Sequence, residues 1–61
     1  MQGGSNRILS AKEAAEYLAI KYPTLLARYK EWGLVYYKYG SLVRFRERDL
    51  ENWVASRRVS P

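Results

Sequence analysis

The stretch that decides the fold reads Ser10-Ala11-Lys12-Glu13-Ala14-Ala15-Glu16-Tyr17-Leu18. Ser10 and Glu13 stand three residues apart, which is the spacing of a capping box, where each side chain binds the backbone amide of the other residue. Four apolar residues recur at the i, i+3, i+4, i+7 spacing of one helix face: Ala11, Ala14, Ala15 and Leu18. The stretch therefore predicts a helix that begins at Ser10, and its alanines allow a second helix to approach closely.

A second helix is predicted a few residues downstream. Pro23 suits its first turn, where the missing N–H of proline costs nothing, and residues 24–32 continue it. Gly33 ends this helix in the position after the C-cap. The apolar stripe consists of Leu25, Tyr29 and Trp32. Because a short connection with one apolar anchor, Ile20, joins the two helices, the order indicates a helix-turn-helix.

Residues 35–46 predict a β-hairpin, because β-branched and aromatic residues flank Gly40-Ser41. A two-residue turn would pair Tyr39 with Leu42, and a three-residue loop over 40–42 would pair Tyr39 with Val43. The second register collects Tyr37, Tyr39, Val43 and Phe45 on one face and Tyr36, Lys38, Arg44 and Arg46 on the other. Since a slip of one residue turns the whole apolar set to solvent, we expect the three-residue loop.

A third helix follows the hairpin, with Glu47 and Asp49 in its first turn, where carboxylates suit the helix dipole. Its apolar stripe consists of Leu50, Trp53 and Val54. Six aromatic residues are assigned to the core: Tyr29, Trp32, Tyr37, Tyr39, Phe45 and Trp53. The expected fold is mostly α with a small β-hairpin, in the order of a winged helix-turn-helix. We expect a disordered segment at 1–7, one domain at 8–58 and a tail at 59–61.

The composition limits the chemistry of the chain. Its 61 residues include no Cys and no His, which removes disulfides, the usual zinc clusters and every nucleophile paired with histidine. We therefore expect neither an enzyme nor a bound cofactor or metal. The sequence shows no apolar run long enough to span a membrane and no signal-peptide pattern at its start. We expect a cytoplasmic protein with no membrane partner and no small-molecule substrate.

The basic charge is concentrated in the middle of the chain. The chain contains eleven Lys and Arg and six Asp and Glu, which gives a net charge of +5. Residues 17–46 hold six cations and one acid, whereas 1–16 and 47–61 each balance to zero. An isoelectric point near 9.8 with one sign of charge in a single segment is typical of a nucleic-acid-binding domain. If most of the six met phosphate, log K would fall against log salt with a slope of about −4 to −5.

The chain resembles the excisionase-type, MerR-like DNA-binding domain over residues 9–53. The resemblance rests on a series of residues at matching spacings: Leu9-Ser10, Glu13-Ala14-Ala15, Leu18, Ile20, Thr24-Leu25, Gly33-Leu34, Gly40, Arg44-Phe45, Asp49-Leu50 and Trp53. Four positions depart from the pattern. Val35 stands where proline is usual, Ala19 replaces a turn glycine, Pro23 is unusual in the recognition helix, and Ala27 replaces a frequent arginine.

This resemblance implies a small phage or mobile-element protein that acts as an excisionase, or recombination directionality factor. Such proteins bind direct repeats at an attachment site in double-stranded DNA, often cooperatively and head to tail. They bend the DNA and help a tyrosine or serine integrase excise the element. The second helix is implied to enter the major groove, and the wing to contact the adjacent minor groove or backbone. A small transcriptional regulator and a protein-interaction adaptor remain the alternatives.

Candidate DNA contacts fall into three groups. The recognition helix offers Lys21, Tyr22, Thr24 and Arg28, of which Arg28 can bind guanine through two hydrogen bonds. Thr24 matches the family's recognition-helix threonine, and Arg44 matches its wing arginine. The wing and phosphate group consists of Lys30, Lys38, Ser41, Arg44 and Arg46, in which the cations position the duplex without reading it. The first helix adds Ser10 and Lys12.

Overall fold

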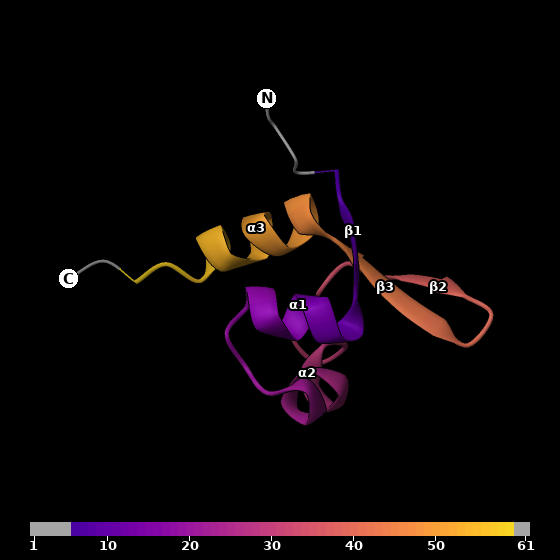
Figure 1. Ribbon diagram of the computed structural model, residues 1–61. Helices are drawn as coiled ribbons and strands as arrows, with labels where there is room; N and C mark the ends of the chain where they lie inside the picture. Colours follow the sequence, from indigo (N-terminus) through magenta and orange to yellow (C-terminus); the bar gives the residue numbers. More distant parts are fainter. Residues whose placement is uncertain (1–5, 60–61) are drawn as a thin grey trace.

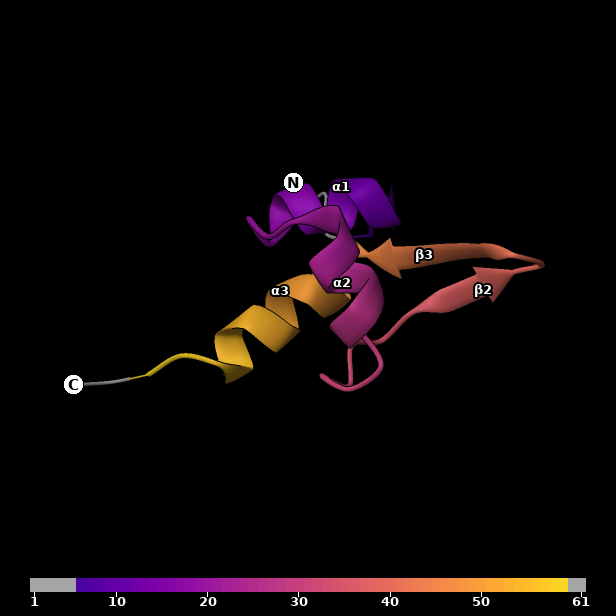
Figure 2. The same cartoon turned by 90° about the horizontal axis from the view of Figure 1, so that it is seen from below.

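The computed structural model describes residues 6–59 as three helices and three strands. In chain order these are β1 (Ile8–Ser10), α1 (Ala11–Tyr17), α2 (Tyr22–Arg28), β2 (Tyr37–Tyr39), β3 (Leu42–Arg46) and α3 (Glu47–Ser56) (Figure 1). The strands form one antiparallel sheet in the order β1-β3-β2. The β2–β3 hairpin projects away from the helices as a wing, which is plain from two directions (Figures 1 and 2). The predicted winged helix-turn-helix fold is confirmed.

The predicted capping box fixes the start of α1. The Ser10 hydroxyl accepts a hydrogen bond from the Glu13 amide at 3.1 Å, and the Glu13 carboxylate accepts one from the Ser10 amide at 2.8 Å. The predicted alanine face is buried as well, with Ala14 and Ala15 lying in the core. Because alanine is small, α1 and α2 pack together at close range in this region.

A left-handed residue ends α1. Ala19 has a φ of 59°, a conformation that costs an L residue about 1–2 kcal/mol. Its amide donates to the Glu16 carbonyl at 3.1 Å, and the Ile20 amide donates to the Ala15 carbonyl at 2.9 Å. These two bonds are those of a Schellman motif, whose left-handed position is usually occupied by glycine. The turn glycine that the resemblance implies at this position therefore fits a conformation that the turn requires.

The second helix is shorter than the sequence predicts, since α2 ends at Arg28 rather than at Trp32. Hydrogen-bonded turns nevertheless continue the chain, because the Trp32 amide donates to the Arg28 carbonyl at 2.9 Å. Gly33 has a φ of 73°, and the next amide, that of Leu34, donates to the Tyr29 carbonyl at 3.1 Å. Gly33 therefore closes this turn segment in a left-handed conformation, whereas the predicted role as the residue after the helix C-cap is wrong, because the C-cap of α2 is Tyr29.

Strand β1 was not predicted. Its three residues pair with β3, placing Leu9 opposite Phe45, and the Glu47 amide donates to the Arg7 carbonyl at 2.9 Å. Three residues are too few to show an alternation of apolar and polar positions, so the strand could not be read from local sequence. Of the predicted 1–7 segment, residues 1–5 lie outside the described part of the chain, as do 60 and 61 of the predicted tail.

The predicted hairpin register is wrong by one residue. Tyr39 pairs with Leu42 across a two-residue turn, so Lys38 pairs with Val43. Gly40 has a φ of 60° while Ser41 does not have a positive φ, which is the pattern of a type II′ turn. Because neighbouring side chains on a strand alternate, Lys38 now shares a face with Val43 and Phe45, and the opposite face carries Tyr37, Tyr39, Arg44 and Arg46.

The core lies where α1, α2 and α3 meet the base of the wing. Phe45, Leu25 and Leu50 are its largest fully buried side chains. The Tyr29 ring stands edge-on to Phe45 at 5.7 Å between centroids and to Tyr36 at 4.9 Å. The nine buried residues are Leu9, Ala11, Ala14, Ala15, Leu25, Tyr29, Leu34, Phe45 and Leu50.

Of the other aromatic residues assigned to the core, two tryptophans pack against it and one tyrosine is exposed. Trp32 and Trp53 are partly buried and stack at 5.3 Å, and the Trp53 indole N–H donates to the Trp32 carbonyl at 3.1 Å. Tyr39 was assigned to the core, but it is 55% exposed near the tip of the wing. Val54 was assigned to the apolar stripe of α3, but it is 46% exposed. The wing carries Tyr39 away from the body, so no element covers its ring.

Candidate nucleic-acid interface

The exposed face of α2 is the first part of the site. Leu25 is the buried residue that anchors this helix, and Tyr22, Thr24 and Arg28 are exposed. The N-cap position belongs to Lys21, whose side chain makes no capping hydrogen bond. Thr24 is therefore not the capping residue of α2, and its hydroxyl stands on the exposed surface. Arg28 forms an exposed ion pair with Glu31 at 3.1 Å.

The six central cations differ in how far neighbouring acids engage them. Arg28 pairs with Glu31, and the Arg46 guanidinium lies 3.7 Å from Asp49 and also donates to the Tyr37 hydroxyl. Within residues 6–59 no ion pair engages the other four, which are Lys21, Lys30, Lys38 and Arg44. An exposed ion pair contributes little stability, so Arg28 can exchange Glu31 for another partner at small cost.

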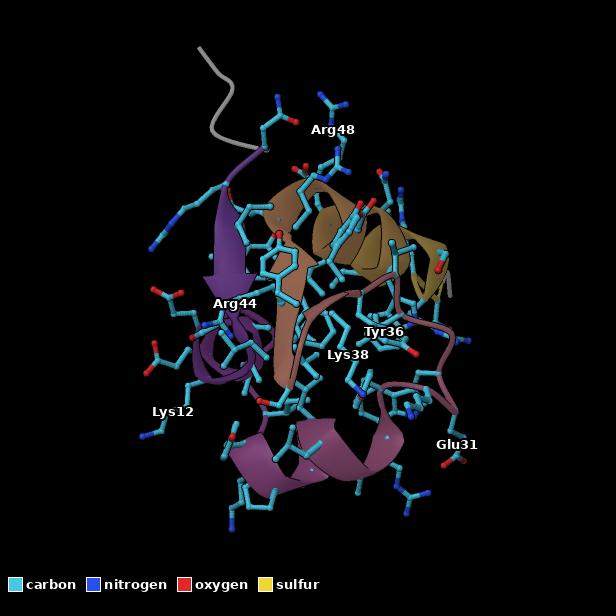
Figure 3. The ribbon with its side chains drawn as sticks, turned by 90° about the vertical axis from the view of Figure 1, so that its right-hand side faces the viewer. Lys12, Glu31, Tyr36, Lys38, Arg44 and Arg48 are labelled. Carbon is cyan, nitrogen blue, oxygen red and sulfur yellow. The ribbon has the colours of Figure 1, made fainter. Side chains whose placement is uncertain are left out.

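The observed register divides the cations of the wing. The sequence predicted that Lys38, Arg44 and Arg46 share one face, and this grouping is wrong. Arg44 and Arg46 lie on one face with Tyr37, while Lys38 lies on the other. Viewed from the wing, Arg44 lies near the start of α1 and Lys38 lies between the wing and α2, whereas Arg48 stands at the far end by α3 (Figure 3).

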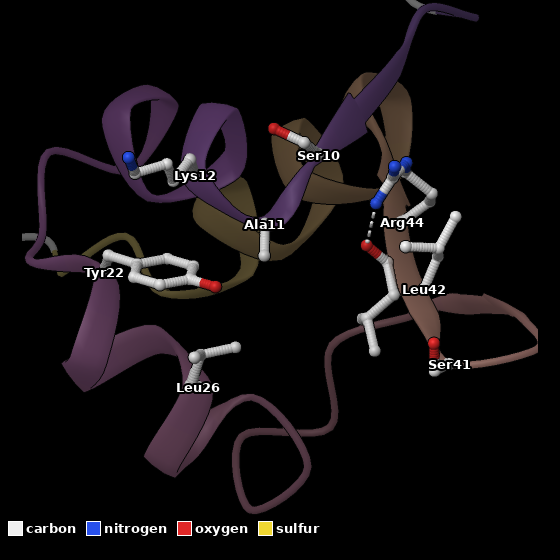
Figure 4. Close-up of a pocket in the computed structure, with 9 residues that line it drawn as sticks. Ser10, Ala11, Lys12, Tyr22, Leu26, Ser41, Leu42 and Arg44 are labelled. Atoms are coloured by element: carbon white, nitrogen blue, oxygen red, sulfur yellow. Dashed lines mark hydrogen bonds between the residues drawn. The ribbon is translucent and has the colours of Figure 1, made fainter.

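A hollow of about 310 Å³ joins α2, the start of α1 and the wing. Five of its nine lining residues belong to the eleven candidate contacts: Ser10, Lys12, Tyr22, Ser41 and Arg44. Figure 4 shows these side chains around the opening, with Lys12 and Tyr22 on one side and Arg44 and Ser41 on the other. The other four lining residues are Ala11, Leu26, Leu42 and Val43. The remaining candidates, Lys21, Thr24, Arg28, Lys30, Lys38 and Arg46, lie outside it.

Sequence reasoning missed Leu26 and Leu42, the two exposed apolar residues of this hollow. They are 42% and 51% exposed. Leu26 could have been recognised from the sequence, because it follows Tyr22 by four residues and therefore lies on the same face of the helix. Leu42 could not be identified, because the predicted loop placed it at the tip of the turn rather than in β3.

A second hollow, on the other side of the α1 start, has the opposite charge character. It is lined by Arg7, Leu9, Glu13, Glu16, Tyr17 and Glu47. Burial raises the pKa of Tyr17, and the charges of Glu51 and Glu47 raise it further. The backbone amide of Ser10 holds the pKa of Glu13 below its ordinary value, and Arg7 and Arg44 lower it further. None of the lining residues of the first hollow is acidic, so of these two hollows it is the one that suits a polyanion.

A family model described as a helix-turn-helix domain matches residues 8–58. The chain belongs to this family. No curated protein and no solved structure matches it significantly. As a helix-turn-helix domain the protein is a small DNA-binding protein, which agrees with the exposed α2 and the cationic hollow beside it. Between residues 6 and 59, no helix has the length and apolar character needed to cross a membrane.

Proposed function

We propose that this helix-turn-helix protein binds double-stranded DNA in a sequence-specific manner and acts as an excisionase. In this role α2 enters the major groove and the wing meets the neighbouring minor groove or backbone. The protein bends attachment-site repeats, associates head to tail along them in the cytoplasm, and directs a tyrosine or serine integrase toward excision. Cleavage and rejoining of the strands belong to the integrase.

The observation that carries this proposal is the position of α2 beside the wing. Leu25 is buried and holds α2 against the body, so Tyr22, Thr24 and Arg28 stand on the exposed side of the helix. A recognition helix needs side chains that reach base edges from its exposed face. Arg28 supplies the guanidinium fork that matches the O6 and N7 acceptors of guanine.

The excision role is supported by the family resemblance over residues 9–53, and the DNA-binding role by the helix-turn-helix family match over 8–58. A single small module covers only about 600–1,000 Å² of protein surface on DNA. Useful affinity on a natural site would therefore come from neighbouring copies on tandem repeats. Head-to-tail association along the repeats is what the family resemblance implies, and it would supply those neighbouring copies.

A footprint on the DNA that flanks its own gene, with and without the cognate integrase, tests the proposal. We expect protection of direct repeats at an attachment site and a rise in excision when the protein is added. Protection of a promoter alone would assign it to transcriptional regulation. Binding to a protein partner, with no mobility shift of DNA at low salt, would assign it to the adaptor class.

The base-reading role of Arg28 has its own test. Arg28→Ala should weaken binding to the protected repeat by about 1–3 kcal/mol if the guanidinium reads a base. The matched control is Arg48→Ala, because Arg48 stands at the far end of the molecule by α3 (Figure 3). An equal loss for Arg28→Ala on mixed-sequence DNA would show that this residue meets phosphate and reads no base.

A further inference from the structure

We infer that the hollow between α2 and the wing is the seat of one sugar–phosphate strand of the duplex. This inference rests on the proposed DNA-binding function. A single strand of the backbone separates a major groove from the minor groove beside it. If α2 lies in the first groove and the wing meets the second, that strand must pass between the two elements. The hollow lined by both of them lies in this position.

The rim of the hollow suits phosphate. Lys12 and Arg44 stand on opposite sides of it, and the hydroxyl groups of Ser10, Ser41 and Tyr22 add polar atoms (Figure 4). One Arg44 amino group donates to the Val43 carbonyl at 2.9 Å. A guanidinium carries five N–H donors, so this single bond orients the group and leaves donors for phosphate oxygens. Glu13, whose pKa Arg44 helps to lower, already accepts a hydrogen bond from the Ser10 amide.

The floor of the hollow suits the sugars. Leu26 from α2 and Leu42 from β3 are both about half exposed, and Ala11 from α1 and Val43 from β3 also line the hollow. Deoxyribose presents C–H groups between consecutive phosphates, so a strand places apolar and anionic groups in alternation. A cationic and hydroxyl rim around an apolar floor matches this alternation. A peptide could also contact the leucines, but the net charge of +5 and the absence of acids among the lining residues favour a polyanion.

The test measures binding of the full chain to a labelled mixed-sequence duplex of about two helical turns over a range of salt concentrations. Lys12→Gln and Arg44→Gln should each reduce the slope of log K against log salt by about 0.9, which is the value of one phosphate contact. Leu26→Ser and Leu42→Ser should weaken binding about three- to tenfold while the slope stays unchanged, because an apolar contact releases no counterion.

Matched controls come from α3. Arg48→Gln removes an exposed cation and Val54→Ser an exposed apolar residue, and neither residue lines the hollow. Both controls should bind as the unchanged protein does. Far-UV circular dichroism and a thermal melt check folding, and all four hollow variants should melt as the unchanged protein does, since none of these side chains is in the buried core.

A second measurement locates the strand itself. Duplexes carrying one neutral methylphosphonate at successive positions should show a loss of binding at one or two phosphates, and that loss should vanish in Arg44→Gln. If the four hollow variants keep both affinity and slope while the unchanged protein binds the duplex, the inference is overturned and the DNA-binding function stands. If the unchanged protein does not bind duplex DNA at all, the proposed function fails and the inference fails with it.

Discussion

The helix pair α1–α2 and the wing differ in what holds them in place. In the helix pair, buried apolar side chains set which face looks inward, and Ala14 and Leu25 are fully buried. In the wing, Phe45 at the base is buried, while Tyr39 and Leu42 near the tip are more than half exposed. Periodicity is therefore a good guide to the helices and a poor guide to the hairpin, because burial selects the register only where a second layer covers the strand.

At its base, the wing is held to α3 by polar contacts. The Tyr37 hydroxyl donates to Asp49 at 3.2 Å and accepts a hydrogen bond from Arg46. The Arg46 guanidinium lies 5.2 Å from the centroid of the Tyr37 ring. These contacts tie β2 and β3 to the first turn of α3. Tyr37 thus stabilises the wing through its hydroxyl and the face of its ring, and not as a buried core residue.

The largest effect should come from removing the single fully buried side chain of the wing. Phe45→Ala should lower the free energy of unfolding by about 3–5 kcal/mol. A domain of this size is stable by about 3–9 kcal/mol, so much of the variant should be unfolded. Urea denaturation followed by circular dichroism measures the loss. Tyr39→Ala at the exposed tip is the control, and a comparable loss there would show that the wing carries a core of its own.

A smaller loss of stability is expected when the hydrogen bonds of the Tyr37 hydroxyl with Arg46 and Asp49 are removed. Tyr37→Phe keeps the ring and removes the hydroxyl between Arg46 and Asp49, so it should cost about 0.5–1.5 kcal/mol. Tyr39→Phe is the matched control, since the Tyr39 ring is largely exposed, and its stability should not change. Equal urea midpoints for the two variants would show that the hydrogen bonds of the Tyr37 hydroxyl do not stabilise the wing.

A substitution in the turn between α1 and α2 should increase the stability of the protein. Ala19→Gly should relieve a left-handed strain of about 1–2 kcal/mol, offset by the extra unfolded-state entropy of glycine, about 0.5–1 kcal/mol. A net gain of about 0.5–1 kcal/mol should appear as a higher urea midpoint. Ala27→Gly, on the exposed side of α2, should destabilise instead. A loss of stability in Ala19→Gly would mean that the Ala19 methyl group has a packing role.

The smallest effect concerns the pH dependence of the α1 capping box. The hydrogen bond that the Ser10 backbone amide donates to the Glu13 carboxylate holds the pKa of Glu13 below its ordinary value of 4.5. A folded-state pKa that is depressed gives stability that is present above 4.5 and is lost as the pH falls through the folded value. Urea midpoints at successive acidic pH values should therefore decline less in Glu13→Gln than in the unchanged protein. Identical pH profiles for the two proteins would show that the Glu13 carboxylate contributes nothing to the loss of stability at acidic pH.

Much of the helical part could be predicted because its determinants are local. The Ser10–Glu13 box and the alanine face of α1 each depend on residues within a few positions of one another. The hairpin could be located but not registered. The prediction counted Tyr37 and Tyr39 as apolar residues that required burial, yet one finds a polar partner in α3 and the other stays exposed. The cations of the wing could be named from the sequence as candidate DNA contacts, but their division between two faces followed from the observed register.

The amino-acid sequence by itself determined the order of the three helices and the hairpin, the capping box that starts α1, and the concentration of positive charge in the middle of the chain. These properties depend on short-range hydrogen bonds, side-chain periodicity and composition. Tertiary structure alone decided that β1 pairs with β3, which face of the wing the body covers, and that Leu26 and Leu42 line one hollow. Those outcomes depend on contacts between residues distant in the chain, which no local pattern encodes.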